Sequence, residues 1–388
     1  MAKKNPPSLN VLIIDKHVLI RQTVSNILRK MNGMNAIHSV SSIDEKFAKS
    51  DISRIQPDVI ILGMDTPDSK EMKILSIIRD KYPIIPVVLL TPLNGIGATT
   101  ALKGLKMGAV EFITKPDKNV GVMLATRHFR KRIVPLMNII HDLNTSFLLA
   151  NRSSEQTVLV VNKVSDKKPQ KTSNSVELMV VAGCTGGVLS LFDLISNLPD
   201  EIPVPIIIIQ HMPKIYTRKL AEELDKITPM NVREAQNDSP LIPGQIYLAP
   251  GAYHTEVRNE GNRKKLYTHR GPREKKNRPS IDVVLRTAVQ AYDNKVLSVF
   301  LSGGGNDGLE GAGYVMDAGG KLLLQDKESS LVWHLPSQIS ELYPAQPQIH
   351  VKKLGTEIMK NIMGSRSKKN MQYSSENTAK WFYGEADS

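Results

Sequence analysis

The chain has 388 residues, of which 41% are hydrophobic, and its formal net charge is +13. The hydrophobic fraction is that of a globular protein, and the length is too great for a single domain core, so we expect two domains. The first residues carry charge without an apolar stretch, and no apolar run approaches the ~20 residues that cross a bilayer, so we expect neither a secretory signal nor membrane insertion. The single cysteine, Cys184, excludes an internal disulfide and fits a reducing, cytoplasmic setting.

The excess positive charge gathers in short runs between the apolar segments. These runs are Lys3–Lys4, Lys167–Lys168 with Lys171, Arg273–Lys276 and Arg366–Lys369. None is interleaved with aromatic residues, and no zinc-finger or RNA-binding pattern appears, so we expect no nucleic-acid partner. Solvated loops are the simplest explanation, and electrostatic steering toward an acidic protein surface is the functional alternative.

Residues 8–135 alternate between apolar runs and amphipathic segments. The runs that we expect to be strands lie at 9–14, 58–62, 87–90 and 110–114, and Ile20, Val24 and Ile27 mark the apolar face of the first helix. Strands this apolar are typical of a parallel sheet that is covered by helices on both faces. The sequence therefore predicts a five-stranded, doubly wound α/β domain over 8–135.

Residues 136–176 lose this alternation, and their polar composition predicts a linker, although 157–161 looks strand-like. A second alternation over 177–360 predicts a larger parallel-sheet domain. Its buried-strand candidates are 178–182, 204–209, 245–249, 296–301 and 320–324. For 361–388 we expect a polar tail, which is either mobile or, through its aromatic residues at 381–383, a docking peptide.

Three of these strands end in residues that are capable of chemistry. Cys184 lies in a glycine-rich turn before an amphipathic helix, whose free N–H groups and dipole favour a lowered thiol pKa and stabilise a developing oxyanion. The second strand leads to His211, a candidate general base, and the third leads through glycines to Asp307, which could orient the imidazole. Because reactive groups collect beyond the carboxyl ends of parallel strands, we expect these three side chains to form one site.

Each pattern also has a simpler explanation. A buried cysteine is usually a small core residue, Asn-Asp-Gly is a common turn, and a Gly-rich loop can cradle phosphate. A mononucleotide site lacks the expected Gly-Lys-Ser/Thr sequence here. The chain order nucleophile, histidine, aspartate also differs from that of the α/β-hydrolases, so that fold is not the model.

Five motifs in chain order resemble the chemotaxis protein-glutamate methylesterases, the CheB family. They are Gly-Cys-Thr-Gly-Gly at 183–187, Gln-His-Met-Pro at 210–213, Tyr-Leu-Ala-Pro-Gly at 247–251 with His254, Arg-Pro-Ser-Ile-Asp at 278–282 and Gly-Asn-Asp-Gly at 305–308. The N-terminal domain looks like the response-regulator receiver of that family, so the resemblance covers nearly the whole chain. It implies hydrolysis of glutamate methyl esters on chemoreceptors, together with deamidation of certain receptor glutamines.

In this resemblance Cys184 takes the place of the family's nucleophilic serine, and His211 and Asp307 complete the triad. The implied oxyanion donors are the backbone N–H groups of Thr185 and of Gly304, where the family usually has methionine. A thiol that is activated by histidine is a competent nucleophile. Sulfur is larger than oxygen, however, so a site shaped for serine can misplace it.

The resemblance also implies a loss in the receiver-like domain. Receivers hold Mg²⁺ with an acidic pair after the first strand and accept phosphate on an aspartate after the third. Here the pair is Asp15–Lys16, and Gly63 stands at the acceptor position, while Thr91 and Lys115 remain where a phosphoryl group would be contacted. We therefore predict that this domain has no phosphoacceptor.

Asp65 lies two residues beyond the acceptor position, displaced by ~7 Å of chain, and we do not expect it to substitute. One carboxylate is too few for a Mg²⁺ site, so we expect no metal. We hypothesise that the Lys16 ammonium lies near Asp15 in place of the metal. The alternative is that Lys16 and His17 are exposed loop residues.

The sequence thus predicts a protein-glutamate methylesterase that works without a cofactor through a Cys-His-Asp triad. Its expected partners are the cytoplasmic domains of methylated chemoreceptors and other chemotaxis signalling proteins. One alternative is a pseudoenzyme that binds these partners without turnover. Another is a DNA-binding response regulator, although 177–360 offers glycine-rich strand ends instead of a helix-turn-helix. Without a phosphoacceptor, the enzyme would be always inhibited, always open, or switched by a partner.

Overall fold

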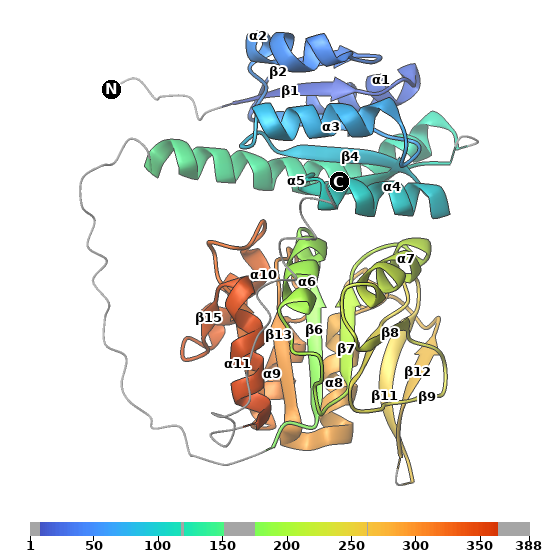
Figure 1. The fold of residues 1–388 in the computed structure, drawn as a ribbon, viewed down its shortest axis with the longest axis vertical. Coiled ribbons are helices and arrows are strands. Elements are labelled where there is room, and N and C mark those ends of the chain that lie inside the picture. Colours follow the sequence, from blue (N-terminus) through green and yellow to red (C-terminus); the bar gives the residue numbers. More distant parts are fainter. Residues whose placement is uncertain (1–7, 118–119, 151–174, 262, 364–388) are drawn as a thin grey trace, which may run out of the picture. The chain divides into compact units, whose positions relative to one another are not determined.

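The computed structural model describes residues 8–117, 120–150, 175–261 and 263–363. The chain divides into two units, Met1–Ser173 and Asn174–Ser388. Each unit contains a parallel sheet that is covered by helices (Figure 1), which confirms the predicted class of two α/β domains. Within the described ranges, no helix is long and apolar enough to cross a membrane. The strand-like run at 157–161, most of the predicted tail and three of the basic runs lie outside them.

The first unit is built on one sheet of five parallel strands in the order β2-β1-β3-β4-β5. Its strands are β1 (Leu9–Ile14), β2 (Met34–Val40), β3 (Val59–Gly63), β4 (Val87–Pro92) and β5 (Glu111–Lys115). Its helical segments are α1 (Val18–Leu28), η1 (Phe47–Asp51), α2 (Ile52–Ile55), α3 (Lys70–Lys81), α4 (Gly95–Lys106) and α5 (Val122–Ala150). No apolar run marked β2, because this edge strand is half exposed along its length.

Helix α5 is longer than the sequence suggested. It continues through Pro135 to Ala150, so the boundary expected at 135 falls inside a helix and the expected linker begins with helical residues. Phe129, Ile133 and Ile140 carry one apolar face across the proline into the core of the first unit. This packing outweighs the backbone hydrogen bond that a proline removes from a helix interior.

The second unit contains a sheet of seven parallel strands in the order β15-β14-β13-β6-β7-β10-β8 and a separate sheet of three strands in the order β11-β12-β9. The strands of the larger sheet are β6 (Leu178–Gly183), β7 (Ile206–Gln210), β8 (Asn231–Glu234), β10 (Gln245–Leu248), β13 (Val296–Phe300), β14 (Lys321–Gln325) and β15 (Gln348–Ile349). The smaller, antiparallel sheet consists of β9 (Ser239–Pro240), β11 (His254–Glu260) and β12 (Arg263–His269). The helical segments are α6 (Gly187–Ser196), α7 (Lys214–Asp225), α8 (Ile281–Tyr292), η2 (Asp293–Lys295), α9 (Leu309–Asp317), α10 (His334–Leu342) and α11 (Val351–Met363).

The five buried strands expected in this unit correspond to β6, β7, β10, β13 and β14. The sequence did not mark β8 and β15, which are short edge strands, or the antiparallel sheet, whose strands are mostly polar. Val257 and Leu266 are the buried hydrophobic residues of the β11–β12 hairpin, and they join the core around α8. Two apolar positions among many polar ones give too weak a pattern to predict a strand.

The order of the larger sheet fixes where reactive residues meet. The chain builds outward from β6 through β7 to one edge and then returns to β13 on the other side of β6, so a topological switch point lies between β6 and β13. In register, Gly183 pairs with Gln210, and Ala182 pairs with Phe300. The segments that follow β6, β7 and β13 therefore leave the sheet at one level, where ligand sites form in open parallel sheets.

Candidate active site

Cys184 lies in a tight turn between β6 and α6. Gly186, the residue before the helix, has φ +75°, and a Cβ there would lie 2.6 Å from the Ser302 hydroxyl oxygen. Glycine is therefore required both for the left-handed backbone and for the close approach. The backbone N–H of Cys184 donates to the Ser302 carbonyl oxygen at 3.1 Å, which ties the turn to the end of β13. The thiol is thus held at a fixed point above the switch point, partly accessible to solvent.

The three residues that the sequence singled out lie in one chain of contacts. The Nδ1 atom of His211 is 3.4 Å from the Sγ atom of Cys184, and its Nε2 atom is 2.9 Å from Oδ2 of Asp307. The imidazole therefore bridges the thiol and the carboxylate. This geometry meets the requirement for an activated nucleophile, in which the base contacts the nucleophile and a third group orients the base.

Asp307 is almost fully buried, and several donors hold its carboxylate. Oδ1 accepts hydrogen bonds from the Ser280 hydroxyl at 2.7 Å and from the backbone N–H of Asp282 at 3.1 Å. Oδ2 accepts one from the backbone N–H of Ile281 at 3.1 Å, in addition to the contact with His211. These amides are at the N-terminus of α8, where the helix dipole also favours negative charge. Burial alone would raise the pKa of Asp307, but the hydrogen bonds from His211 and Ser280 outweigh it and lower the pKa.

The same contacts favour an ion pair between Cys184 and His211. Burial opposes charge on the thiol, yet the neighbouring imidazolium and the hydrogen bond from it lower the pKa of Cys184. Burial also opposes charge on the imidazole, but Cys184 and Asp307 together raise the pKa of His211 to about 10. The geometry therefore supports a thiolate beside an imidazolium at neutral pH.

The backbone N–H groups of Thr185 and Gly304 both donate toward the sulfur of Cys184 and contribute to the lowered pKa of its thiol. These are the two groups that the sequence suggested as oxyanion donors. An oxygen that develops negative charge beside the sulfur would lie within their reach. A Cβ at position 304 would make only an ordinary contact, 3.6 Å from Val332. The backbone there would therefore accommodate a side chain such as methionine.

Gln210 and Ser280, which lie in the motifs at 210–213 and 278–282, also support the site, although the sequence alone indicated no role for them. The amide nitrogen of Gln210 donates to the backbone carbonyl of Cys184 at 2.7 Å and so anchors the nucleophile turn. Its amide oxygen lies where a Cβ at Gly187 would be, which explains why glycine begins α6. Ser280 caps α8 and also binds Asp307, so one hydroxyl joins the helix start to the carboxylate. Both residues are polar and buried, and Gln210 directly precedes the candidate base His211. A polar residue at the end of an apolar run was the sequence pattern that could have indicated the role of Gln210.

A second acid lies behind Asp307. Asp282 is fully buried, and its Oδ1 accepts the backbone N–H groups of Gly308 at 2.9 Å and Gly311 at 2.7 Å, which fixes the turn that presents Asp307. The ammonium of Lys275 is 2.7 Å from Oδ2 of Asp282 and also contacts Glu310 at 3.0 Å. Lys275 therefore compensates the buried charge of Asp282, which supports the turn that presents Asp307.

Glu274, Asp282 and Glu310 form the one group of acids, within the described part of the chain, that is close enough to share a metal ion. Lys275 and Arg286 already neutralise them, because Arg286 binds Glu274 with two hydrogen bonds at 3.0 Å. These residues do not fit a metal ion.

In the first unit, ion pairs occupy the edge of the sheet where a receiver would be phosphorylated. The Lys115 ammonium lies 2.7 Å from Asp15 and 2.7 Å from Asp65. Lys16 pairs with Asp65 at 2.7 Å, and the two lysines lower the pKa of Asp65 to about 2 against the effect of burial. The Lys16 ammonium was expected near Asp15. Asp65 raises the pKa of Lys16 most, and the charge of Asp15 does help to raise it, but the direct ion pair of Lys16 is with Asp65, while Lys115 and His17 contact the Asp15 carboxylate. Lys16 is nevertheless largely exposed, as the alternative expected.

Gly63 makes room for this ion-pair network. A Cβ at this position would lie only 1.9 Å from Oδ2 of Asp15, so the Asp15 carboxylate fills the space that a side chain at 63 would need. Thr91 and Lys115 are buried at the same edge of the sheet, Thr91 near the end of β4 and Lys115 at the end of β5. Of these two residues, Lys115 contacts the Asp15 carboxylate directly.

Comparison with known proteins supports two family assignments. A model described as CheB methylesterase matches residues 179–358, and one described as response regulator receiver domain matches residues 11–125. A protein from Trichodesmium erythraeum named protein-glutamate methylesterase/protein-glutamine glutaminase is 30% identical over 359 residues, which cover 92% of this chain and 99% of the relative. A protein of the same name from Archaeoglobus fulgidus is 32% identical and covers 86% of this chain and 92% of its own length. The crystal structure of the Thermotoga maritima CheB methylesterase catalytic domain is 32% identical, with a TM-score of 0.47, and covers 48% of this chain and 98% of that one.

The ion pair predicts unusual reactivity for the single thiol. Iodoacetamide reacts with thiolates, so the rate of Cys184 alkylation should rise with pH. The midpoint, the pH at which this rate is half of its maximum, should lie below the ordinary thiol pKa of about 8.5. In His211→Ala the imidazolium is gone, and the N–H groups of Thr185 and Gly304 alone oppose the effect of burial, so the midpoint should rise. The pH profile of alkylation, followed by mass spectrometry, measures both midpoints, with N-acetylcysteine as the reference. Equal midpoints in the two proteins would contradict the ion pair.

Loss of the lysine that neutralises Asp282 should weaken the catalytic turn. Lys275→Met leaves the buried Asp282 carboxylate without its cation, and we expect the free energy of unfolding of the second unit to fall by about 2 kcal/mol. This loss is smaller than the loss expected for a fully buried ion pair, because Lys275 reaches solvent. Lys276→Met removes the same charge from an exposed neighbour and should be nearly neutral. Urea unfolding of both variants measures the difference. Equal effects of the two substitutions would show that the Asp282 pair does not support the turn.

Restoring an acidic side chain at position 63 should not restore phosphorylation. In Gly63→Asp the new Cβ collides with Asp15, so we expect a destabilisation of about 1–3 kcal/mol and no phosphoryl group after incubation with acetyl phosphate and Mg²⁺. Gly95→Asp is the matched control, because a Cβ there meets nothing within 4 Å. Thermal unfolding and intact mass measure the two effects. A phosphorylated Gly63→Asp protein would refute this prediction.

Proposed function

This chain belongs to the CheB methylesterase family, and we propose that it hydrolyses glutamyl methyl esters on the cytoplasmic domains of chemoreceptors with Cys184 as nucleophile. One observation carries the proposal: the imidazole of His211 lies between the Cys184 thiol, at 3.4 Å, and the Asp307 carboxylate, at 2.9 Å. The relatives' name also includes a glutaminase activity, and the proposal extends to deamidation of glutamine at the same site.

The first half of the reaction follows from the ion pair. The Cys184 thiolate attacks the ester carbonyl carbon, and the carbonyl electrons move to the oxygen, which the N–H groups of Thr185 and Gly304 can stabilise. The tetrahedral intermediate collapses, the C–O bond to the methoxy group breaks, and Nδ1 of His211 gives that oxygen its proton. Methanol leaves, and the glutamyl group remains as a thioester on Cys184.

The second half returns the enzyme to its starting state. His211, now neutral, takes a proton from a water molecule whose oxygen attacks the thioester carbonyl. The C–S bond breaks, and the sulfur leaves as a thiolate beside the imidazolium. The new carboxylic acid releases its proton to solvent, so that one ester and one water give one carboxylate, one proton and one methanol. Asp307 keeps the imidazole oriented throughout and stays ionised.

A thiol is compatible with this site because its surroundings favour the deprotonated thiolate before substrate binds. A serine hydroxyl would have to lose its proton to His211 during attack, whereas the Cys184 proton already resides on the imidazole in the favoured ion pair. Sulfur is also a good leaving group in the second half-reaction. The cytoplasmic location and the chemoreceptor partners belong to the same proposal, as does a receiver that no phosphoryl group switches.

The nucleophile can be tested by substitution. Cys184→Ala should lower methanol release from methylated receptor by about 1,000-fold or more, because no atom remains to form the acyl-enzyme. Cys184→Ser should keep measurable release, because His211 can serve as base for a hydroxyl. Methanol is quantified after single and multiple turnovers, and circular dichroism controls for folding. Wild-type release by Cys184→Ala would exclude Cys184 as nucleophile, and no release by any variant would favour a receptor-binding pseudoenzyme.

A further inference from the structure

The two candidate oxyanion donors, the N–H groups of Thr185 and Gly304, belong to peptide units that are also bound at their other ends. A peptide unit is planar and trans, so its N–H and its C=O point in opposite directions. A hydrogen bond that holds the carbonyl oxygen of one residue therefore fixes the direction of the N–H group of the next residue. The groups that bind the carbonyls of Cys184 and Gly303 thus decide where the two donors point.

Two hydrogen bonds hold the carbonyl oxygen of Cys184. The side-chain amide nitrogen of Gln210 donates to it at 2.7 Å, and the backbone N–H of Gly187 donates to it at 2.9 Å. Both donors lie at the carbonyl end of the peptide unit, opposite the Thr185 N–H. That N–H is thereby directed toward the Cys184 sulfur, to which it donates.

The carbonyl oxygen of Gly303 is held in the same way. The backbone N–H of Leu335, in the first turn of α10, donates to it at 2.9 Å. The N–H of Gly304, at the opposite end of this peptide unit, donates toward the same sulfur. The sulfur therefore faces two peptide units, each of which is fixed by a hydrogen bond to its carbonyl oxygen.

The amide of Gln210 is fixed in one orientation. The residue ends β7, next to β6 in the sheet (Figure 1), and only 2% of it is exposed. Its amide oxygen lies 2.6 Å from the positions that Cβ atoms at Gly183 and Gly187 would take, so two glycines make room for it. Exchanging the amide oxygen and nitrogen would bring two oxygens together, so the nitrogen faces the Cys184 carbonyl.

Stability does not account for this amide. Its oxygen is buried without a hydrogen-bond partner among the described residues, which costs free energy that an apolar side chain of the same length would avoid. The N–H of Gly187 already satisfies the Cys184 carbonyl, so Gln210 adds a second hydrogen bond to the same oxygen. The contribution that remains for Gln210 is to fix the direction of the peptide unit.

A second buried glutamine supports the other peptide unit. Gln325 ends β14, which lies on the other side of β13 from β6. Its amide oxygen accepts the backbone N–H of Ser302 at 2.7 Å, and its amide nitrogen donates to the Ser329 carbonyl at 2.7 Å. Gln325 thus joins the turn after β13 to the segment that leads to α10, the helix that supplies the Leu335 N–H.

We propose that Gln210 is a positioning residue for the oxyanion, because it orients the Thr185 N–H through the Cys184 carbonyl without touching the substrate. The inference rests on the proposed function and adds a residue to its machinery. As the C–S bond forms, the carbonyl oxygen of the substrate gains negative charge, which the two N–H groups stabilise. A reaction of Cys184 that develops no oxyanion should not depend on Gln210.

Gln210→Met tests this role, because methionine has a similar length and no donor. The ester p-nitrophenyl acetate acylates a thiolate through an oxyanion, and its p-nitrophenolate leaves without a proton. Iodoacetamide alkylates the same thiolate by displacement of iodide, without an oxyanion. Removal of an oxyanion donor lowers the rate about 100-fold or more, and Gly187 still holds the carbonyl in this variant, so we expect acylation to slow about tenfold. Alkylation should change by less than about twofold.

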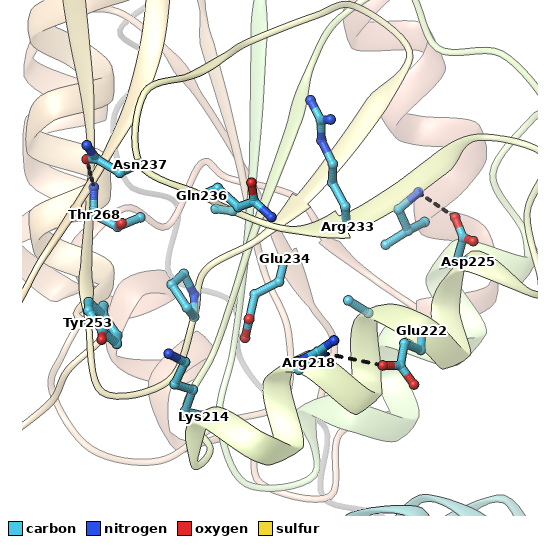
Figure 2. A pocket seen from close by; sticks show the side chains of 14 residues that line it. Lys214, Arg218, Glu222, Asp225, Arg233, Glu234, Gln236, Asn237, Tyr253 and Thr268 are labelled. Atoms are coloured by element: carbon cyan, nitrogen blue, oxygen red, sulfur yellow. Dashed lines mark hydrogen bonds and ion pairs between the residues drawn. The ribbon is translucent and has the colours of Figure 1, made fainter. Parts of the chain in front are cut away.

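Both reactions are measured at a pH above the alkylation midpoint of each protein, so that the thiol is ionised and a change in its pKa does not contribute. Cys184→Ala gives the background reaction of other residues. Gln236→Met is the matched control, because Gln236 is exposed in the wall of an open hollow beside α7 (Figure 2), and neither turn lines this hollow. The control variant should react like wild type in both assays.

Slower acylation with unchanged alkylation would uphold the inference, and Gln210→Leu is the second variant if methionine prevents folding. An equal loss of both reactions would show that Gln210 only keeps the turn folded. No loss of either reaction would show that the Thr185 N–H is oriented without Gln210. Each of the last two results would overturn the inference.

Methanol release separates this inference from the proposed function. With methylated receptor, Gln210→Met should lower kcat about tenfold and leave KM unchanged, because the Thr185 N–H acts on the intermediate and not on the bound ester. Slower acylation by p-nitrophenyl acetate, without methanol release by wild type, would uphold the role of Gln210 and reject the esterase. Methanol release at equal rates by wild type and Gln210→Met would uphold the esterase and reject the role of Gln210.

Discussion

The arrangement of the site depends on the buried carboxylate of Asp307. Its two oxygens accept backbone amides at the start of α8, the Ser280 hydroxyl and the imidazole of His211. Because those donors are fixed by a helix terminus, the carboxylate stays ionised away from water and holds the imidazole in one orientation. The raised pKa of His211 and the lowered pKa of Cys184 both follow from that fixed charge and from their mutual attraction. The same fixed charge is therefore what favours the charged form of the cysteine at this position.

The two units use the corresponding edge of a parallel sheet in opposite ways. In the second unit, the strand ends carry a thiol, an imidazole and a carboxylate that contact one another in a row. In the first, Lys115 links Asp15 to Asp65, and Asp15 fills the space that a side chain at Gly63 would need. In this network the positive charges of Lys16 and Lys115 compensate the negative charges of Asp15 and Asp65. The first unit thus has a receiver fold in which Asp15, Asp65 and Lys115 form ion pairs with one another.

Periodicity and motif order predicted a large part of this structure. Buried strands such as β3, β6 and β7 have near-continuous apolar sequences, because both faces of a parallel sheet are covered, and such runs are visible without any tertiary information. Mixed polar and apolar sequences occur in the edge strands β2 and β8 and in the β11–β12 hairpin, because part of each of these strands is exposed to solvent. Helix α5 likewise continues past the boundary expected at 135, because its apolar face packs on both sides of Pro135 and keeps the helix intact.

The sequence by itself determined which residues have the chemistry for a nucleophile, a base and an orienting acid, and that each of them follows a strand. Only the tertiary structure decided that Gln210, Ser280 and the Lys275–Asp282 pair support them, and that Lys16 pairs with Asp65 instead of Asp15. The physical reason is that strand patterns reflect burial, a local property of the chain. Hydrogen bonds and ion pairs between residues up to 118 positions apart depend on how the strands are ordered and in which register they pair.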